Sequence, residues 1–167
     1  ATFDEAVSLL KESPKGKTVV MAGGSDLIGV LKEQILEDYP EKVVDLKTVR
    51  GGEYIKQDGD TIEIGALTKL CDIVKSDLLN EKAPVLSQAA RSVATPLIRN
   101  VATMGGNICQ DVRCWFYRYP HGIGGRMDCM RKGGKECYAV MGDNRYHSIF
   151  GGMKVHTTPC SVQCPAN

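Results

Sequence analysis

A short β-branched run that passes directly into two glycines and then into a helical pattern is the feature that most constrains this chain. Residues 18–21 predict a strand, and residues 27–35 carry apolar side chains at helical spacing. Gly23 and Gly24 lie between them and have no side chains to keep a ligand away. Because the free N–H groups at the start of a helix favour an anion, typically a phosphate, this junction is a candidate anion-binding loop.

The same junction has a second interpretation. It lacks the G-x-G-x-x-G pattern and a Walker lysine, so neither a Rossmann fold nor a P-loop is predicted. A tight turn in which Ser25 or Asp26 caps the following helix would need the same glycines. An anion loop and a structural turn therefore both remain open from this segment alone.

A second glycine pair, Gly105 and Gly106, follows a helix predicted over residues 83–93 and is expected to lie in a loop. The hydroxyl of Thr103 and the amide of Asn107 could both donate to phosphate oxygens. Two glycine loops that converge on one ligand would be stronger evidence for a binding site than either loop alone.

The remaining patterns predict further helices and strands around these loops. Helices are expected over residues 3–10 and 68–76, a strand over 42–46, and a hairpin with an Asp-Gly turn over 54–64. Cys71 lies on the apolar side of its helix and is predicted to be a buried core thiol. The mixture of elements predicts an α+β fold.

Composition excludes several classes of protein. The 167 residues are enough for one domain or two small lobes, and 43% hydrophobic and 25% charged residues with a net charge of +1 are typical of a globular protein. No polyanion partner such as nucleic acid is implied. With no apolar run of about 18 residues and no basic-then-apolar start, neither a membrane span nor a signal peptide is predicted, and a cytoplasmic location is expected.

The cysteines are unevenly distributed. Six of the seven follow residue 108, which favours metal ligation in a reducing compartment over a disulfide framework. Six basic residues outnumber three acidic ones between residues 111 and 136, and this surplus would compensate a cluster of thiolates.

Four cysteines are candidate ligands: Cys109, Cys114, Cys129 and Cys137. There is no C-x-x-C pair, so iron, zinc and an unligated loop all remain open. Aromatic residues between 115 and 119 and at 138 would shield a redox centre or would simply stabilise the loop. The histidines lack paired ligand spacing and are not expected to bind a metal.

Two ordered motifs resemble the FAD-binding domain of the molybdenum hydroxylases, which includes the flavin subunits of xanthine dehydrogenase and carbon monoxide dehydrogenase. They are residues 21–27 (MAGGSDL) and residues 98–108 (IRNVATMGGNI), and the resemblance covers roughly residues 1–109. It implies that FAD is bound through its diphosphate by Ala22, Gly23, Gly24, Ser25, Asp26, Leu27, Thr103, Gly105, Gly106 and Asn107. No catalytic acid, base or nucleophile is assigned, since the protein would position and tune the flavin.

The segment that follows is similar to a narrower subset of flavin subunits with an inserted [4Fe-4S] cluster, as in hydroxybenzoyl-CoA reductase and bacterial aldehyde oxidoreductases. Cys114, Cys129 and Cys137 match three of its ligands. Val155 stands near the expected place of the fourth, so Cys160 is expected to substitute, with Cys109 as the alternative.

Residues 156–167 resemble the start of the iron-sulphur domain that precedes glutamate-synthase-type NAD(P)H oxidoreductases. The expected architecture is a two-lobed PCMH-type FAD-binding fold with a truncated second lobe. Its parts are a first FAD lobe (1–57), a partial second lobe (58–109), a cluster-bearing loop (110–152) and a tail or the start of an iron-sulphur segment (153–167).

These resemblances imply a flavin-dependent oxidoreductase component that relays electrons between FAD and iron-sulphur clusters. Its expected partners are a molybdenum-cofactor subunit and a [2Fe-2S] subunit, or a glutamate-synthase-type oxidoreductase. The alternatives are a flavin-free iron-sulphur or zinc-binding interaction subunit and a purely structural domain.

Overall fold

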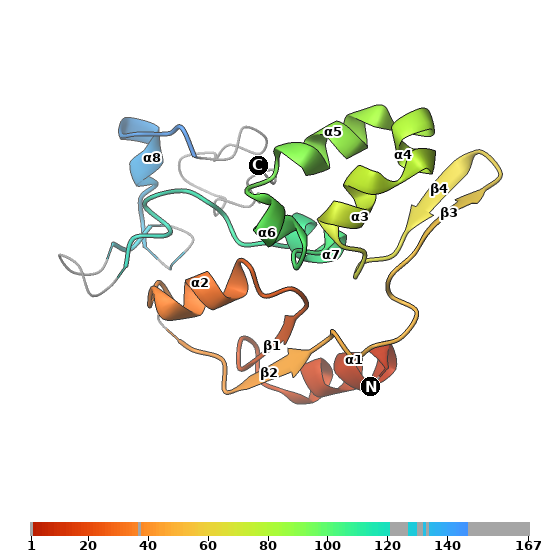
Figure 1. Cartoon of the computed structure of the whole chain (residues 1–167). Helices are drawn as coiled ribbons and strands as arrows, with labels where there is room; N and C mark the ends of the chain where they lie inside the picture. Colours follow the sequence, from red (N-terminus) through yellow and green to blue (C-terminus); the bar gives the residue numbers. More distant parts are fainter. Residues whose placement is uncertain (1, 37, 121–126, 130–131, 133, 147–167) are drawn as a thin grey trace. The chain divides into compact units, whose positions relative to one another are not determined.

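The computed structural model describes residues 2–36, 38–120, 127–129, 132 and 134–146 (Figure 1). The elements are, in order, α1 (Phe3–Glu12), β1 (Thr18–Met21), α2 (Leu27–Lys32), β2 (Lys42–Asp45), β3 (Ile55–Asp58), β4 (Thr61–Ile64), α3 (Leu70–Lys75), α4 (Asp77–Lys82), α5 (Pro84–Ser92), α6 (Pro96–Arg99), α7 (Met104–Ile108) and α8 (Tyr138–Met141). Helices and strands are both present, as expected for an α+β fold.

The chain forms two compact units. Among the described residues, unit 1 contains 2–25 and 38–109, and unit 2 contains 26–36, 110–120, 127–129, 132 and 134–146. The chain therefore passes between the units after Ser25, before Asp38 and after Cys109. The expected division into two FAD lobes, a cluster-bearing loop and a tail stays a prediction.

Local sequence signals explain the first half of unit 1. Helix α1 begins with a capping box, in which Thr2 Oγ1 accepts from the Glu5 N–H at 3.1 Å and a Glu5 carboxylate oxygen accepts from the Thr2 N–H at 2.8 Å. Strand β1 pairs in parallel with β2, and β3 pairs with β4 in an antiparallel hairpin. Gly59 has a φ of +56° in the turn between β3 and β4. The predicted strands and hairpin are confirmed.

The second half of unit 1 is helical and supplies its hydrophobic core. Buried side chains from α3, α4 and α5 pack together with Ala102. These side chains are Leu70, Ile73, Leu79 and Ala90. Cys71 is only partly buried, and its Sγ donates to an Asp72 carboxylate oxygen at 3.5 Å. The prediction of a buried core thiol is therefore wrong, because Leu70 and Ile73 occupy the inward face of α3.

The expected loop between residues 96 and 107 contains two short helices instead. Thr95 Oγ1 accepts from the Ile98 N–H at 3.4 Å and so caps α6, whose first residue is Pro96. Thr103 Oγ1 accepts from the Gly106 N–H at 3.2 Å and caps α7. A single threonine thus starts each helix, and neither helix is long enough to show apolar periodicity.

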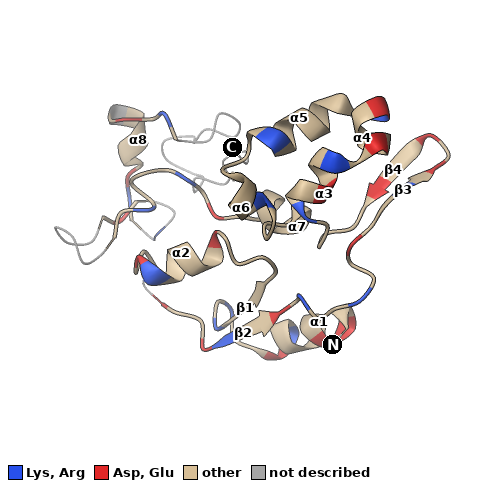
Figure 2. Ribbon diagram, in the orientation of Figure 1, with Lys and Arg blue, Asp and Glu red and all other residues tan. Residues whose placement is uncertain are grey.

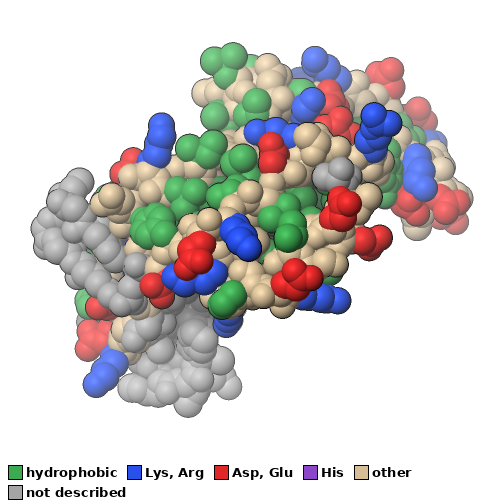
Figure 3. All heavy atoms as spheres, turned by 90° about the horizontal axis from the view of Figure 1, so that it is seen from below, with side chains coloured by type: hydrophobic (Ala, Val, Ile, Leu, Met, Phe, Trp, Pro, Cys, Tyr) green, Lys and Arg blue, Asp and Glu red, His purple; other side chains and the backbone are tan. Residues whose placement is uncertain are grey.

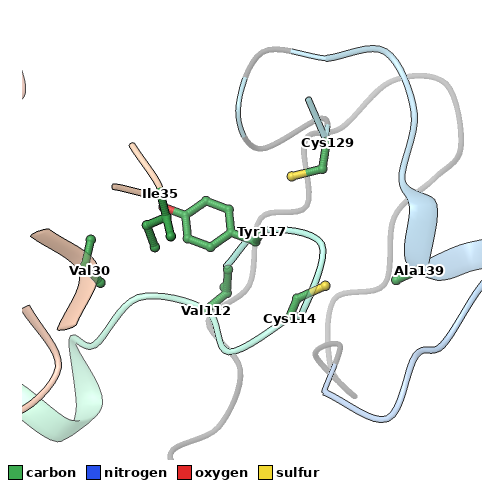
Figure 4. Close-up of a cluster of buried hydrophobic side chains, with 7 residues drawn as sticks. All are labelled: Val30, Ile35, Val112, Cys114, Tyr117, Cys129 and Ala139. Carbon is green, nitrogen blue, oxygen red and sulfur yellow. The ribbon is translucent and has the colours of Figure 1, made fainter. Parts of the chain in front are cut away.

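Unit 2 has its own hydrophobic core, drawn in Figure 4. The buried residues are Val30, Ile35, Val112, Cys114, Tyr117, Cys129 and Ala139. They come from α2 with the residues just after it, from the segment that follows the crossing at residue 109, and from the segments around residue 129 and α8. Two of the predicted metal ligands are therefore buried in this core.

The surface mixes both charge signs. Figure 2 shows acidic and basic residues interspersed over both units, and Figure 3 shows hydrophobic side chains between charged ones on the face seen from below. Among the residues that the structure describes, no helix has the length and apolar character to cross a bilayer.

Candidate functional site

The first glycine segment lies against the backbone that leads into the second. A Cβ on Gly23 would lie 2.0 Å from the carbonyl oxygen of Val101 and 3.1 Å from the Cα of Ala102. Any side chain at this position would therefore collide with backbone that cannot swing away. Gly24 has a φ of +75°, a conformation that other residues rarely adopt. Both glycines are required by the fold itself, and Gly23 brings the two predicted loops side by side.

The second glycine segment is joined to residues 66–70 by backbone hydrogen bonds. The Leu70 N–H donates to the Ala102 carbonyl at 2.9 Å, the Met104 N–H to the Thr68 carbonyl at 2.8 Å and the Gly105 N–H to the Ala66 carbonyl at 2.8 Å. A Cβ on Gly105 would lie 2.9 Å from that same carbonyl oxygen. Three backbone hydrogen bonds thus hold the segment, and Gly105, like Gly23, permits a close backbone approach.

Thr103 is buried, and its hydroxyl oxygen accepts from the Gly106 N–H as the cap of α7. The hydroxyl still has a proton to donate, since a hydroxyl is both donor and acceptor. The Asn107 N–H donates to the Thr103 carbonyl at 2.8 Å, so the backbone of Asn107 is held within α7 and its side chain is partly buried. The predicted contacts of these two residues with a phosphate stay predictions.

The structure therefore brings together most of the residues that the sequence pointed to. Residues 22–25 and Thr103, Gly105, Gly106 and Asn107 all belong to unit 1. Asp26 and Leu27 belong to unit 2. Within unit 1, the close backbone approach at Gly23 links the first glycine segment to the residues that lead into the second.

Asp26 does not act as the predicted helix cap. It occupies the position before α2, but its side chain makes no capping hydrogen bond. Its carboxylate instead accepts from Arg113 Nη1 at 2.9 Å and from Arg118 Nη2 at 2.9 and 3.1 Å. The Asp111 N–H adds a further bond at 3.3 Å. These partners are far away in sequence, and the local pattern carried no signal for them.

Three predicted metal ligands converge in unit 2. Cys114 and Cys129 are buried (Figure 4). Cys137 is partly buried and packs against the same core. Burial raises the pKa of the Cys114 thiol, and the nearby sulphurs of Cys129 and Cys137 raise it further. Backbone N–H groups of Tyr117 and Phe116 act in the opposite direction by favouring the thiolate.

The described residues alone do not form a metal site. Within the described ranges, no three His, Cys, Asp or Glu side chains form a group that could hold a metal ion. None of the five described cysteines is in a disulfide. Cys160 and the three histidines lie outside the described residues, and Cys109 is exposed and belongs to unit 1.

The aromatic residues near the cysteines are arranged in two ways. Tyr117 is buried in the core and Phe116 packs against it, so these two rings belong to the same core as the cysteines. Trp115 is half exposed and stacks on Tyr146 with ring centroids 5.1 Å apart. Only part of the predicted aromatic cover therefore belongs to the core that contains the cysteines.

Residues 1–114 match a family described as the FAD-binding domain in molybdopterin dehydrogenases. The match covers more than half of the chain, and the chain belongs to this family of flavin-binding domains from oxidoreductases. The predicted family of FAD-binding domains is confirmed. The matched range includes both glycine segments.

Individual relatives agree with the family. The chain is 34% identical over 107 residues to the nicotinate dehydrogenase FAD-subunit of Eubacterium barkeri, covering 64% of this chain and 36% of the relative. It is 33% identical over 104 residues to the carbon monoxide dehydrogenase medium chain of Hydrogenophaga pseudoflava, covering 62% and 35%. The chain thus spans little more than a third of the length of these relatives.

Solved structures share the fold. Carbon monoxide dehydrogenase from Oligotropha carboxidovorans matches with a TM-score of 0.60 and 32% identity, over 64% of this chain and 36% of that one. Quinoline 2-oxidoreductase from Pseudomonas putida 86 matches with a TM-score of 0.60 and 25% identity, over 67% and 38%.

Proposed function

We propose that this chain binds FAD through its diphosphate, using residues 22–25 and Thr103, Gly105, Gly106 and Asn107. The observation that carries the proposal is the contact of Gly23 with the backbone of Val101, which sets the two glycine segments of the family side by side. Backbone N–H groups of glycine segments can approach a diphosphate closely. The flavin, when bound, would supply two-electron redox chemistry, and this chain would supply its position.

In this proposal the chain is an electron-transfer subunit or module of a molybdenum-hydroxylase-like complex. It would relay electrons between FAD and iron-sulphur clusters, with a first FAD lobe over residues 1–57 and a partial second lobe over 58–109. The names of its relatives as a medium chain and a FAD-subunit support a place within a multi-chain enzyme.

We further propose that Cys114, Cys129 and Cys137 hold a [4Fe-4S] cluster, with Cys160 as the fourth ligand and Cys109 as the alternative. The supporting observation is that the three cysteines meet in one core beside two backbone N–H groups that favour a thiolate. Such a cluster, when bound, would carry single electrons.

Anaerobic purification of the chain tests both parts of the proposal. We expect a yellow-brown protein that releases flavin on denaturation and contains iron with acid-labile sulphide. Iron or zinc without flavin would favour the alternative, a flavin-free metal-binding interaction subunit, for which the converging cysteines are the supporting observation. A colourless protein without flavin or metal would contradict both.

The partners are proposed on the same grounds: a molybdenum-cofactor subunit with a [2Fe-2S] subunit, or a glutamate-synthase-type NAD(P)H oxidoreductase. The second partner rests on residues 156–167, which lie outside the described residues. Affinity purification of the tagged chain from its native cells, followed by mass spectrometry of the co-purified subunits, distinguishes the two. A cytoplasmic location remains a prediction that the same cell fractions would test.

A further inference from the structure

Both glycine segments continue directly into unit 2. Ser25 is the last residue of its part of unit 1, and the next residue is Asp26. The second segment ends with α7 and Cys109, after which Gln110 and Asp111 belong to unit 2. The ends of the two segments are therefore continuous with two short stretches of unit 2, and those stretches contact each other.

Asp26 makes that contact. Its carboxylate accepts from the Asp111 N–H, from Arg113 and twice from Arg118. Its side chain is only 16% exposed, and that of Arg118 only 19%. Charge-assisted bonds with limited exposure are stronger than those of a surface ion pair, because water screens them less.

Arg118 is anchored independently of Asp26. Its Nε donates to the Val112 carbonyl at 2.7 Å and its Nη2 to the Asp111 carbonyl at 2.9 Å. The guanidinium is thus fixed on the segment that follows the second glycine pair, and Asp26 attaches the first segment to it.

We propose that Asp26 is a positioning residue that clamps the ends of the two diphosphate-binding segments, and that it does not itself contact FAD. The inference rests on the proposed FAD binding. Gly23 against Val101 holds the two segments together within unit 1, and Asp26 holds their continuations together within unit 2. With its oxygens engaged by two arginines, the carboxylate has no role as a partner for a diphosphate, which it would repel.

The substitution Asp26→Asn tests this proposal, because it keeps the size of the side chain and removes the charge and one acceptor oxygen. The matched control is Glu63→Gln, which removes the carboxylate of the Lys56–Glu63 pair (2.8 Å) on the β3–β4 hairpin. Binding of FAD, ADP and riboflavin to the full chain is measured by titration calorimetry, and folding is checked by circular dichroism.

We expect Asp26→Asn to weaken FAD and ADP binding by about tenfold. This change corresponds to the free energy of about one charge-assisted hydrogen bond, which the variant loses. Binding of riboflavin, which has no phosphate, should change by less than about twofold. In the control variant, the affinities for FAD, ADP and riboflavin should all change by less than about twofold. This difference between phosphate-bearing and phosphate-free ligands would not follow from a general loss of stability.

Unchanged FAD and ADP binding in a folded Asp26→Asn variant would overturn the clamp, as would an equal loss for riboflavin. If that variant does not fold, Arg113→Gln removes only the more exposed partner (46%) and should weaken ADP binding by about threefold; no change would overturn the proposal. A wild-type chain that binds neither FAD nor ADP would instead refute the proposed function, and the clamp with it.

Discussion

Gly23 and Gly29 lie close together in sequence, but only Gly29 has space for a side chain. A Cβ at Gly23 would meet the Val101 carbonyl oxygen at 2.0 Å, whereas a Cβ at Gly29 would have nothing within 4 Å. Gly23 is needed for a close backbone contact, whereas Gly29 lies inside a helix and makes no such contact. Comparing substitutions at the two positions therefore distinguishes the loss of the contact from the general effect of replacing a glycine.

We predict that Gly23→Ala lowers the free energy of unfolding by about 1–3 kcal/mol and weakens FAD binding, because Val101 must move. Gly29→Ala should be neutral or stabilise by up to about 1 kcal/mol, since alanine is the better helix former. Urea unfolding and FAD titration of both variants measure these effects. A Gly23→Ala variant that matches wild type in both would contradict the close approach of the two segments.

The cysteines of α3 and of the unit 2 core provide a second pair at the residue scale. Cys129 is buried beside Cys114, whereas Cys71 lies at the side of α3 next to Asp72. We predict that Cys129→Ser removes the iron from the purified protein and leaves flavin largely in place, because the proposed flavin residues belong to unit 1. Cys71→Ser should retain both.

Iron and acid-labile sulphide analysis together with the flavin absorbance measures the outcome. Equal loss of iron and flavin in Cys129→Ser would show that the cysteine-rich segment is needed for the fold. Retention of iron would remove Cys129 from the ligand set.

At the scale of elements, α6 and α7 are two very short helices that each begin with a capping threonine. Thr103 Oγ1 accepts from the Gly106 N–H, and Thr95 Oγ1 accepts from the Ile98 N–H. Only α7 carries residues of the proposed diphosphate site. A loss of the cap should therefore have different consequences in the two helices.

We predict that Thr103→Ala and Thr95→Ala each lower the free energy of unfolding by about 1 kcal/mol through the lost cap. Only Thr103→Ala should also weaken FAD and ADP binding, and Thr103→Ser should restore the binding because it keeps the hydroxyl. Chemical denaturation and ligand titration measure both properties. An equal effect of Thr95→Ala on binding would mean that α7 has no special role.

The elements that the sequence predicted correctly are those with local signals. Apolar periodicity and an Asp-Gly turn were sufficient for α1, α5, β1 and the β3–β4 hairpin. The short helices α6 and α7 were not predicted, because about one turn of helix is too short for apolar periodicity to be detected. The position of Cys71 was not predicted because the buried residues of its helix are Leu70 and Ile73, with Val74 packed against the same core.

Some features of the candidate site were predictable from local sequence, and others depend on contacts between residues far apart in the chain. The glycine segments were visible as motifs, and so were the clustered cysteines. The role of Gly23 depends on Val101, and the role of Asp26 depends on Arg113 and Arg118, which are 87 and 92 residues away. No spacing rule connects residues so far apart, so these contacts required the folded chain.

At the scale of the whole molecule, the two proposed ligands belong to different units with separate cores. The unit 1 core contains Leu70, Ile73 and Ala90, and the unit 2 core contains Cys114 and Cys129 among its buried residues. A ligand that binds only the folded state stabilises it, by about 2.7 kcal/mol at a hundredfold excess over its Kd. The stabilisation should be greatest in the unit whose residues hold the ligand.

We therefore predict that removal of metal by a chelator accelerates amide hydrogen exchange in residues 110–120 and 134–140 and leaves α5 at its original rate. Metal ligands in a small core replace part of the stabilisation that apolar burial supplies elsewhere, and the unit 2 core includes the cysteines themselves. Exchange is followed by mass spectrometry of peptides from the full chain, with the flavin-saturated protein as the reference. Uniform acceleration of α5 and residues 110–120 would show that the two units unfold together, and unchanged exchange in both would mean that the cysteines of unit 2 hold no stabilising metal.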